Sequence, residues 1–260
     1  MSERRALDGR VAVITGAGRG IGRAIALRYA AEGAAIVVSA RTASDLEAVL
    51  ADAATDDERG LAVVADALDP DGARRPVHAA LERFGCVDVL VNNVGGNAGG
   101  NPDPFAADDA AFHRTLTLNL TSAWWASTAA LPAMRDRRFG RIINIGSGAS
   151  KHAASSVAYT TAKHGLVGFT RQLAAATARH GITVNCLCPG WTNTSALDFD
   201  VIAGRTGRTP EQERARAEAD SLQRRILEPE ELTGMATLLA GADGGGITGQ
   251  VISVDGGYRV

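Results

Sequence analysis

Apolar residues gather in seven short runs along the chain, separated by longer stretches with a helical pattern of apolar and polar positions. The runs are rich in β-branched residues, and they occupy 11–15, 35–39, 61–65, 87–91, 141–145, 182–187 and 250–254. They are apolar on both faces, as a parallel sheet covered by helices on each side requires. Each run therefore predicts a buried strand.

Helical patterns fill the intervals between these runs. They lie near 20–32, 43–54, 70–84, 106–135, 157–180 and 228–240. Strand and helix alternate repeatedly, and no linker, low-complexity tract or internal repeat interrupts them. This organisation predicts one doubly wound α/β domain over residues 1–260.

One irregular stretch, 191–227, is long for a connection between a strand and the next helix. Long insertions of this kind often form lids or binding loops, so we expect a substrate lid here. Its arginines have the chemistry to hold a phosphate-bearing substrate. They are interleaved with glutamates, however, and that pattern favours a solvated helix face.

Composition narrows the class of partner. The 260 residues carry a formal net charge of -2, which predicts no basic face for nucleic acid. No run is long enough for a membrane span or a signal peptide, so a cytoplasmic protein without a membrane partner is expected. Cys86, Cys186 and Cys188 lack the spacing of metal ligands or of a disulfide framework, and no metal site is predicted. Cys186 and Cys188 alternate with Leu187, which predicts two small core residues on one strand face.

The first strand leads into "TGAGRGIG" (15–22) and then into a helix. Gly16, Gly20 and Gly22 suit a tight turn in which the backbone approaches a pyrophosphate at the N-terminus of a helix. Arg19 and Ile21 belong to the same turn. A glycine-rich turn without a ligand is the alternative, but its place between strand and helix favours nucleotide binding.

The second strand ends in Ser39, Ala40 and Arg41, with no acid to bind a ribose 2′-hydroxyl. Arg41 can accommodate a 2′-phosphate, and Arg19 adds a second cation. We therefore expect NADP(H) rather than NAD(H), with ordinary surface arginines as the alternative. Asp66 ends the third strand, where it predicts either a contact to the adenine edge or a simple turn.

Several motifs follow one another in a specific order: "TGAGRGIG", "NNVG" (92–95), "LNLT" with Asn119, "NIGS" with Ser147, "YTTAK" (159–163) and "PGWTNT" (189–194). In this order, from Asp8 to Gly257, the chain resembles the short-chain dehydrogenases/reductases. The resemblance implies a seven-stranded Rossmann sheet, NAD(P)(H), and reversible oxidation of an alcohol to a ketone. The chain is most similar to ketoreductases of aromatic polyketide biosynthesis and to 3-oxoacyl reductases.

The resemblance also implies roles for individual residues. Tyr159 would be the acid/base, Lys163 its activator, Ser147 the group that polarises the carbonyl, and Asn119 the holder of a water linked to the lysine. The residues implied to contact the cofactor are Tyr159 and Lys163 themselves, Asn93 and Gly95, and, at the nicotinamide end, Pro189, Gly190, Thr192 and Thr194.

Two departures from the family pattern stand out. Val94 replaces a commoner alanine, and Ser147 precedes Tyr159 by 12 positions, one fewer than expected. Ser147 directly follows its strand, so it is retained over Ser150 and Ser155.

The pairing of Tyr159 with Lys163 makes chemical sense without the family. Residues four apart share a helix face, so the lysine lies near the phenol. An unperturbed tyrosine has a pKa of ~10, and a nearby cation favours the phenolate. The phenol then exchanges protons nearer the working pH, where general acid–base catalysis is most effective.

The expected substrate walls are 95–105, 148–158 and 191–227, because ligands of open α/β sheets bind beyond the carboxyl ends of strands. Besides Ser147 and Tyr159, Trp191 and Leu197 are the predicted substrate contacts. A small-molecule ketone reduced with NADPH is the favoured reaction. The alternatives are an NAD-dependent dehydrogenase oxidising a sugar, sterol or cyclic diol, and a non-catalytic nucleotide-binding regulator.

Two helical stretches, 121–134 and 165–177, are apolar around more of their circumference than one sheet face needs. Excess apolar helix surface indicates either dense core packing or a partner. Members of the resembled family commonly form tetramers through these helices, which implies a homotetramer.

Overall fold

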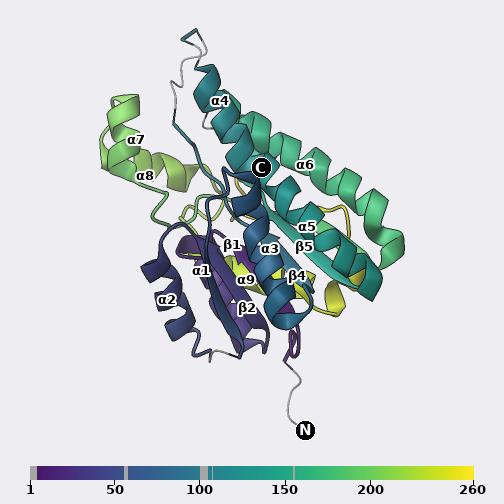
Figure 1. Cartoon of the computed structure of the whole chain (residues 1–260). Coiled ribbons are helices and arrows are strands. Elements are labelled where there is room, and N and C mark those ends of the chain that lie inside the picture. The colour runs from purple at the N-terminus through teal and green to yellow at the C-terminus, as the bar shows by residue number, and fades with distance from the viewer. Residues whose placement is uncertain (1–4, 56–57, 100–104, 107, 155) are drawn as a thin grey trace.

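The computed structural model describes residues 5–55, 58–99, 105–106, 108–154 and 156–260, without the side chain of Arg205. Within these residues a parallel sheet of seven strands forms the centre of the molecule (Figure 1). Its order is β3-β2-β1-β4-β5-β6-β7. The strands are β1 (Val11–Thr15), β2 (Ala35–Ala40), β3 (Gly60–Val64), β4 (Val89–Asn92), β5 (Gly140–Ile145), β6 (Ile182–Pro189) and β7 (Val251–Val254). All seven predicted strands and the predicted doubly wound fold are confirmed, but β3 and β7 are less buried than predicted, because each lies at an edge of the sheet.

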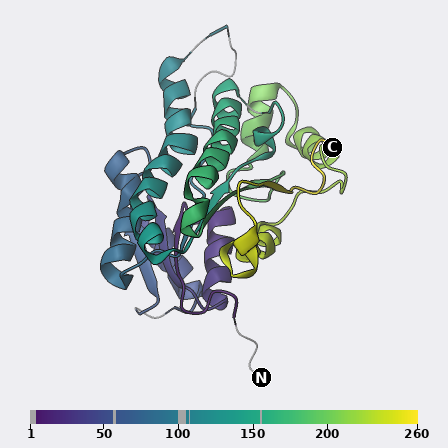
Figure 2. The same cartoon turned by 90° about the vertical axis from the view of Figure 1, so that its right-hand side faces the viewer.

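Helices cover both faces of the sheet (Figures 1 and 2). Side chains alternate along each strand, so Ile14 packs into the core under α1 and α9, whereas Val13 packs into the core under α3 and α5. One layer consists of α1 (Gly20–Ala31), α2 (Ala43–Asp52) and α9 (Thr233–Ala240), and the other of α3 (Pro70–Phe84), α4 (Asp109–Leu116), α5 (Ser122–Arg137) and α6 (Val157–Thr177).

The chain reverses its direction of winding at β1, which pairs with β2 on one side and β4 on the other. Connections leave the two strands in opposite directions at this point, which opens a crevice beyond their carboxyl ends. Thr15, the last residue of β1, joins the two strands. Its hydroxyl donates to Val91 O at 3.3 Å and accepts from Asn93 N at 3.1 Å.

The helix predicted over 106–135 is corrected by the structure. It begins at Asp109 and is interrupted by one π-helical turn, Thr117–Thr121, before α5 begins at Ser122. The buried amide of Asn119 explains the interruption. It bonds to Gly96 as well as to Thr115 O one turn earlier, and the wider turn allows that orientation.

Two other predicted helices are shorter than expected. The 157–180 helix ends at Thr177 and continues as a 3₁₀ turn, Ala178–His180. The 228–240 helix starts with a 3₁₀ turn, Pro229–Leu232, before α9.

The 191–227 segment is helical in part, which agrees with the helix face favoured for its arginines, although no helix bounds were predicted there. It contains α7 (Phe199–Thr206) and α8 (Pro210–Ala219), which project from the sheet and its two layers (Figure 1). Each helix is capped by an acceptor side chain: Asp198 for α7, and for α8 Thr209, in a reciprocal pair with Gln212. The C-terminal residues run beside this segment, where Ser221 bridges to Tyr258 (Figure 2).

The cysteine prediction is confirmed. Cys186 and Cys188 are both buried on β6, with their sulfur atoms 3.7 Å apart and unlinked. In the part of the chain that the structure describes, no helix is long and apolar enough to cross a membrane.

Candidate active site

A cavity of about 1440 Å³ lies beyond the carboxyl ends of the central strands. It collects residues from distant parts of the sequence, as a crevice at a switch point does. Of the residues predicted for catalysis, cofactor or substrate, only Gly22 and Asn119 do not line it. The predicted residues that do are Gly16, Arg19, Gly20, Ile21, Arg41, Asp66, Asn93, Gly95, Ser147, Tyr159, Lys163, Pro189, Gly190, Trp191, Thr192, Thr194 and Leu197.

The glycine turn has the backbone geometry that a pyrophosphate needs. Gly16 and Gly20 have φ values of 64° and 56°, in the left-handed region that favours glycine. A Cβ on Gly22 would collide with the carbonyl of Gly16 and the amide of Asn93, so this glycine serves close packing. Arg19 precedes α1 without a side-chain cap, which leaves the first N–H groups of the helix available to an anion. A dinucleotide diphosphate fits this turn.

Asn93 braces the turn from the neighbouring strand. Its Nδ2 donates to the carbonyls of Thr15 at 3.0 Å and Gly16 at 2.9 Å. The backbone of β4 is thereby tied to the start of the glycine turn. Asn93 thus fixes the shape of the cradle from the wall of the cavity.

The end of the cavity beyond β2 and β3 carries both positively and negatively charged side chains. Arg19 and Arg41 are exposed and form no ion pair among the described residues. Asp45, in the first turn of α2, lies beside Gly18: a Cβ on that glycine would be 3.0 Å from the Asp45 Cβ. Asp45 was not predicted from the sequence, because it lies in the first turn of α2 and not at the end of β2. Asp66 accepts from Leu68 N at 3.0 Å, so its carboxylate closes a local turn at the cavity edge.

Tyr159 and Lys163 come from the first turns of α6. The Ser156 hydroxyl caps this helix and accepts from Tyr159 N at 3.3 Å, which fixes where the tyrosine stands. Lys163 is only 3% exposed, and its Nζ lies 5.6 Å from the centre of the Tyr159 ring. The same Nζ donates to Ile145 O at 2.8 Å. One hydrogen bond to β5 therefore holds a buried cation beside the phenol.

Ser147 leaves β5 in extended conformation and begins the 3₁₀ turn Gly148–Ser150. Its hydroxyl accepts from Ala149 N at 3.1 Å, while Ser150 Oγ accepts from Ser147 N at 3.2 Å. The Ser150 side chain is thus committed to the turn, and it does not line the cavity, whereas Ser147 does. Ser155 and residues 100–104 of the predicted wall lie outside the described residues.

Asn119 lies behind the cavity wall and is buried. Its Oδ1 accepts from Gly96 N at 2.9 Å, and its Nδ2 donates to Gly96 O at 2.7 Å. A Cβ on Gly95 would approach Asn119 Oδ1 to 2.7 Å and Lys163 Nζ to 3.1 Å. The π-helical turn therefore brings Asn119 close to the lysine and anchors the loop after β4.

The "PGWTNT" residues form the opposite wall. Thr192 is buried and pairs with Leu227, which closes the base of the 191–227 segment. The methyl of Thr194 packs over the glycine turn, since a Cβ on Gly20 would lie 3.1 Å from it. Trp191 donates its indole N–H to Asp220 at 3.1 Å.

Several cavity residues were not singled out from the sequence, although 191–227 was predicted as a wall. Arg114, Arg208 and Arg216 line it from α4 and the 191–227 segment, and Tyr258 and Arg259 from the C-terminal end. The ring of Tyr258 packs against Gly148, and burial raises the pKa of its phenol. These residues follow no strand end directly, so only the tertiary fold brings them to the cavity.

Comparisons with known proteins agree with this geometry. The family model for short chain dehydrogenases matches residues 10–200. The short-chain reductase NovJ of Streptomyces niveus is 38% identical over 95% of this chain and 93% of its own. A protein of Streptomyces virginiae named as a ketoacyl reductase of the monensin polyketide synthase is 37% identical, covering 95% and 96%. The structure of levodione reductase superposes with a TM-score of 0.89 at 30% identity, covering 96% of this chain and 97% of that one.

The chain belongs to the short-chain dehydrogenase family. It is an oxidoreductase acting on CH–OH and C=O groups of small molecules with a nicotinamide cofactor, and its relatives include ketoreductases.

Proposed function

We propose that the protein reduces a ketone to a secondary alcohol with NADPH, in the manner of 3-oxoacyl or polyketide ketoreductases. The observation that carries the proposal is the buried Lys163 ammonium 5.6 Å from the Tyr159 ring, in the cavity that also holds Ser147 and the uncapped start of α1. Two relatives named as reductases support the reductive direction.

The roles of the residues follow from their chemistry. When bound, the nicotinamide supplies the hydride that reaches the carbonyl carbon. Tyr159 donates the matching proton to the carbonyl oxygen, and the Lys163 cation stabilises the phenolate left behind. Ser147 Oγ–H donates to the same oxygen as negative charge develops on it. Asn119 is a positioning residue, because it holds the loop at Gly96 and lies near Lys163 through Gly95.

NADP(H) is the proposed cofactor. Ala40 ends β2 where an NAD enzyme would place a carboxylate, and Arg19 and Arg41 both line the cavity nearby. A 2′-phosphate would find two guanidinium groups there. The arrangement of Gly16, Gly20 and Gly22 suits the diphosphate of the same molecule.

Asp45 favours one alternative. Its carboxylate also lines this end of the cavity, where it has the chemistry to accept from a ribose 2′-hydroxyl. In that case the protein would be an NAD-dependent dehydrogenase oxidising a sugar, sterol or cyclic diol. A non-catalytic nucleotide-binding regulator is disfavoured, because Ser147, Tyr159 and Lys163 are all present and converge on one cavity.

Two further features belong to this proposal. The 191–227 segment acts as the substrate lid, since it supplies Trp191 and Leu197 to the cavity wall. The protein assembles as a homotetramer through α5 and α6. Trp124 on α5 is 49% exposed and packs edge-on against Phe169 of α6 at 6.2 Å, which leaves an aromatic patch for a second copy.

The cofactor proposal is tested by titrating the purified protein with NADPH and NADH while following tryptophan fluorescence. We expect tighter binding of NADPH, and a loss of about 10- to 100-fold in its affinity in Arg41→Ala. Arg23→Ala is the matched control, because its guanidinium already pairs with Asp52. Tighter binding of NADH, with no effect of Arg41→Ala, would support the Asp45 alternative.

The reaction is tested by assaying bulky ketones with NADPH and secondary alcohols with NAD⁺. We expect a higher kcat/KM for the reduction of ketones with NADPH than for the oxidation of alcohols with NAD⁺. Oxidation of sugars, sterols or cyclic diols with NAD⁺ as the faster reaction would contradict the proposed direction.

A further inference from the structure

The wall of the cavity formed by the 191–227 segment and the C-terminal end carries arginines. We propose that the substrate bears an anionic group, a carboxylate or a phosphate, which binds Arg208 and Arg216 while the ketone faces Tyr159. The inference rests on the proposed function and names the class of its substrate: a ketone with an acidic group at the end distal to the carbonyl.

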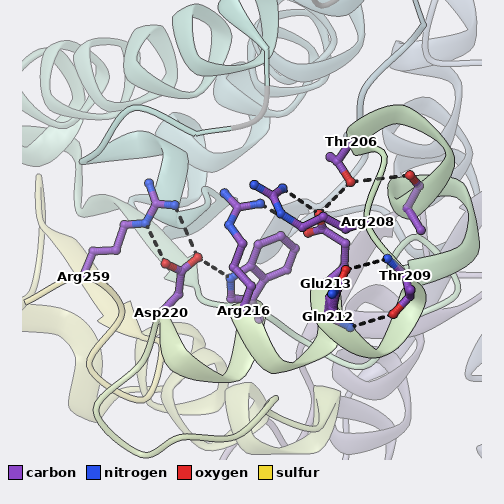
Figure 3. Close-up of polar contacts among 10 residues, drawn as sticks. Thr206, Arg208, Thr209, Gln212, Glu213, Arg216, Asp220 and Arg259 are labelled. Carbon is purple, nitrogen blue, oxygen red and sulfur yellow. Dashed lines mark hydrogen bonds and ion pairs between the residues drawn. The ribbon is translucent and has the colours of Figure 1, made fainter.

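Glu213 holds the two arginines side by side (Figure 3). Its carboxylate is 3% exposed, and it accepts from Arg208 Nη1 at 3.0 Å and from Arg216 Nη1 at 3.2 Å. The Thr206 hydroxyl donates to Glu213 at 2.7 Å. This hydroxyl and the Arg208 guanidinium lower the pKa of Glu213, so it is ionised at neutral pH. The two guanidinium groups are therefore fixed by a buried anion rather than left to move in solvent.

The charges around Glu213 do not cancel. Two guanidinium groups share one carboxylate, which leaves one positive charge. Each guanidinium uses one nitrogen on Glu213 and has no other partner among the described residues, so the remaining N–H groups are free to donate. The planar fork of arginine matches a carboxylate or a phosphate. A substrate anion would neutralise the pair.

The carboxylates lie behind the arginines and not in the cavity. Arg208 and Arg216 are among its lining residues, whereas Glu213 is not. Among the described lining residues the only acids are Asp45 and Asp66, which follow β2 and β3 at the other end. No described carboxylate lines the substrate side of the cavity, and Glu213 and Asp220 are both engaged by arginines.

A second built contact extends this wall. Asp220 accepts from Trp191 Nε1 at 3.1 Å and pairs with Arg259 at 3.3 Å, as Figure 3 shows for the pair. Arg259 also donates to Ala153 O at 2.7 Å. Hydrogen bonds thus tie the C-terminal end to Trp191 and to the loop before Tyr159. The arginine wall is thereby held against the catalytic side of the same cavity.

For the arginines of the 191–227 segment the sequence favoured a solvated helix face, and Arg214 lies on such a face. Arg214 pairs with Glu218 on the exposed side of α8 and does not line the cavity. Arg216, two residues further along α8, turns to the buried Glu213 instead. The helix therefore offers a matched pair of arginines, one facing the cavity and one facing solvent.

Steady-state kinetics with methyl ketones whose chains end in a carboxylate, a phosphate or a methyl ester test the proposal. We expect a lower KM for the anionic ketones, rising with ionic strength because salt screens the arginines. Arg208→Gln and Arg216→Gln should raise KM for the anionic ketones by about 10- to 100-fold and change it little for the esters. Arg214→Gln should behave like the wild type, and the affinity for NADPH should stay unchanged in all three. The better of carboxylate and phosphate identifies the source of the charge.

A binding measurement keeps this test independent of turnover. Calorimetry on the NADPH complex, with aliphatic carboxylates and alkyl phosphates of matched length against the corresponding amides, should show binding of the anions that Arg216→Gln abolishes. Equal binding of amide and anion, or equal losses in Arg214→Gln and Arg216→Gln, would overturn the inference. Turnover of neutral ketones without any preference for anions would overturn it while leaving the proposed function intact. Anion binding without reduction of any ketone would overturn the proposed function alone.

Discussion

At the scale of single residues, the candidate site depends on which polar groups are committed to the fold and which remain for chemistry. Ser147 and Ser150 differ in this respect. Ser150 Oγ accepts from Ser147 N and is buried in the turn, whereas Ser147 lines the cavity with Tyr159 and Lys163. Of these two serines, Ser147 is therefore the one placed to donate to a carbonyl oxygen in that cavity.

Ser147→Ala should therefore lower kcat by about 100- to 1000-fold, the usual effect of removing one donor to a developing oxyanion. Initial rates of ketone reduction measure it. Ser150→Ala is the matched control, because it removes a hydrogen bond within the turn. It is expected to lower the melting temperature and to change kcat little. A larger loss of kcat in Ser150→Ala would show that the wrong serine has been chosen.

Strand ends made most of the site predictable at this scale. Gly16, Asn93 and Pro189 directly follow or end buried strands, Ser147 follows β5 after one residue, and all four line the cavity. Arg208 and Arg216 were not singled out, because their sequence pattern shows alternating charge but not which side of the helix is buried. The burial of Glu213 decides that, and burial of a single acid has no signature in sequence.

At the scale of elements, the glycine turn and the π-helical turn shape the proposed cofactor-binding side of the cavity. The prediction of a turn between β1 and α1 depended on glycine spacing, and it succeeded because left-handed φ values restrict the residue type. The π-helical turn at Thr117–Thr121 was not predicted. The turn is stabilised by hydrogen bonds between Asn119 and Gly96 in the loop after β4. The periodicity of apolar residues along a helix does not report such long-range contacts.

Gly22→Ala tests whether the glycine turn binds the diphosphate of the cofactor. A Cβ there meets the backbone carbonyl of Gly16 and the Asn93 amide, so we expect weaker NADPH binding and a lower melting temperature. Gly234→Ala on α9 is the control, because nothing lies within 4 Å of the added methyl. It should leave NADPH affinity unchanged and stabilise the helix by roughly 0.5–1 kcal/mol. Unchanged NADPH affinity in Gly22→Ala would contradict the role of this turn.

At the scale of the whole molecule, all seven strands were predicted, since each is a short, mostly apolar run of strand-like length, whereas their order in the sheet was not. A helix face was favoured within 191–227, but the bounds of α7 and α8 were not predicted, because few of their residues are buried. Both project from the sheet, and their stability depends on caps and on contacts with the C-terminal end. Such contacts join residues far apart in sequence, which no local pattern records.

Trp124→Arg tests the proposed assembly. An arginine in the aromatic patch on α5 would place charge inside an apolar interface, so the variant is expected to dissociate to smaller species. Light scattering coupled to gel filtration measures the mass. Val64→Arg, at an exposed position of the edge strand β3, should keep the mass of the wild type. A wild-type protein that elutes as a monomer would contradict the tetramer.

A comparison of the wild type with Tyr159→Phe tests whether Tyr159 donates the proton during NADPH-dependent ketone reduction. The measurement is the rate of NADPH oxidation in the presence of a ketone that the wild type reduces, together with the NADPH dissociation constant of both proteins. Loss of the phenolic hydroxyl should lower kcat by about 100- to 10,000-fold, while the dissociation constant stays within about twofold. A variant that binds NADPH normally and retains most of its rate would contradict the account.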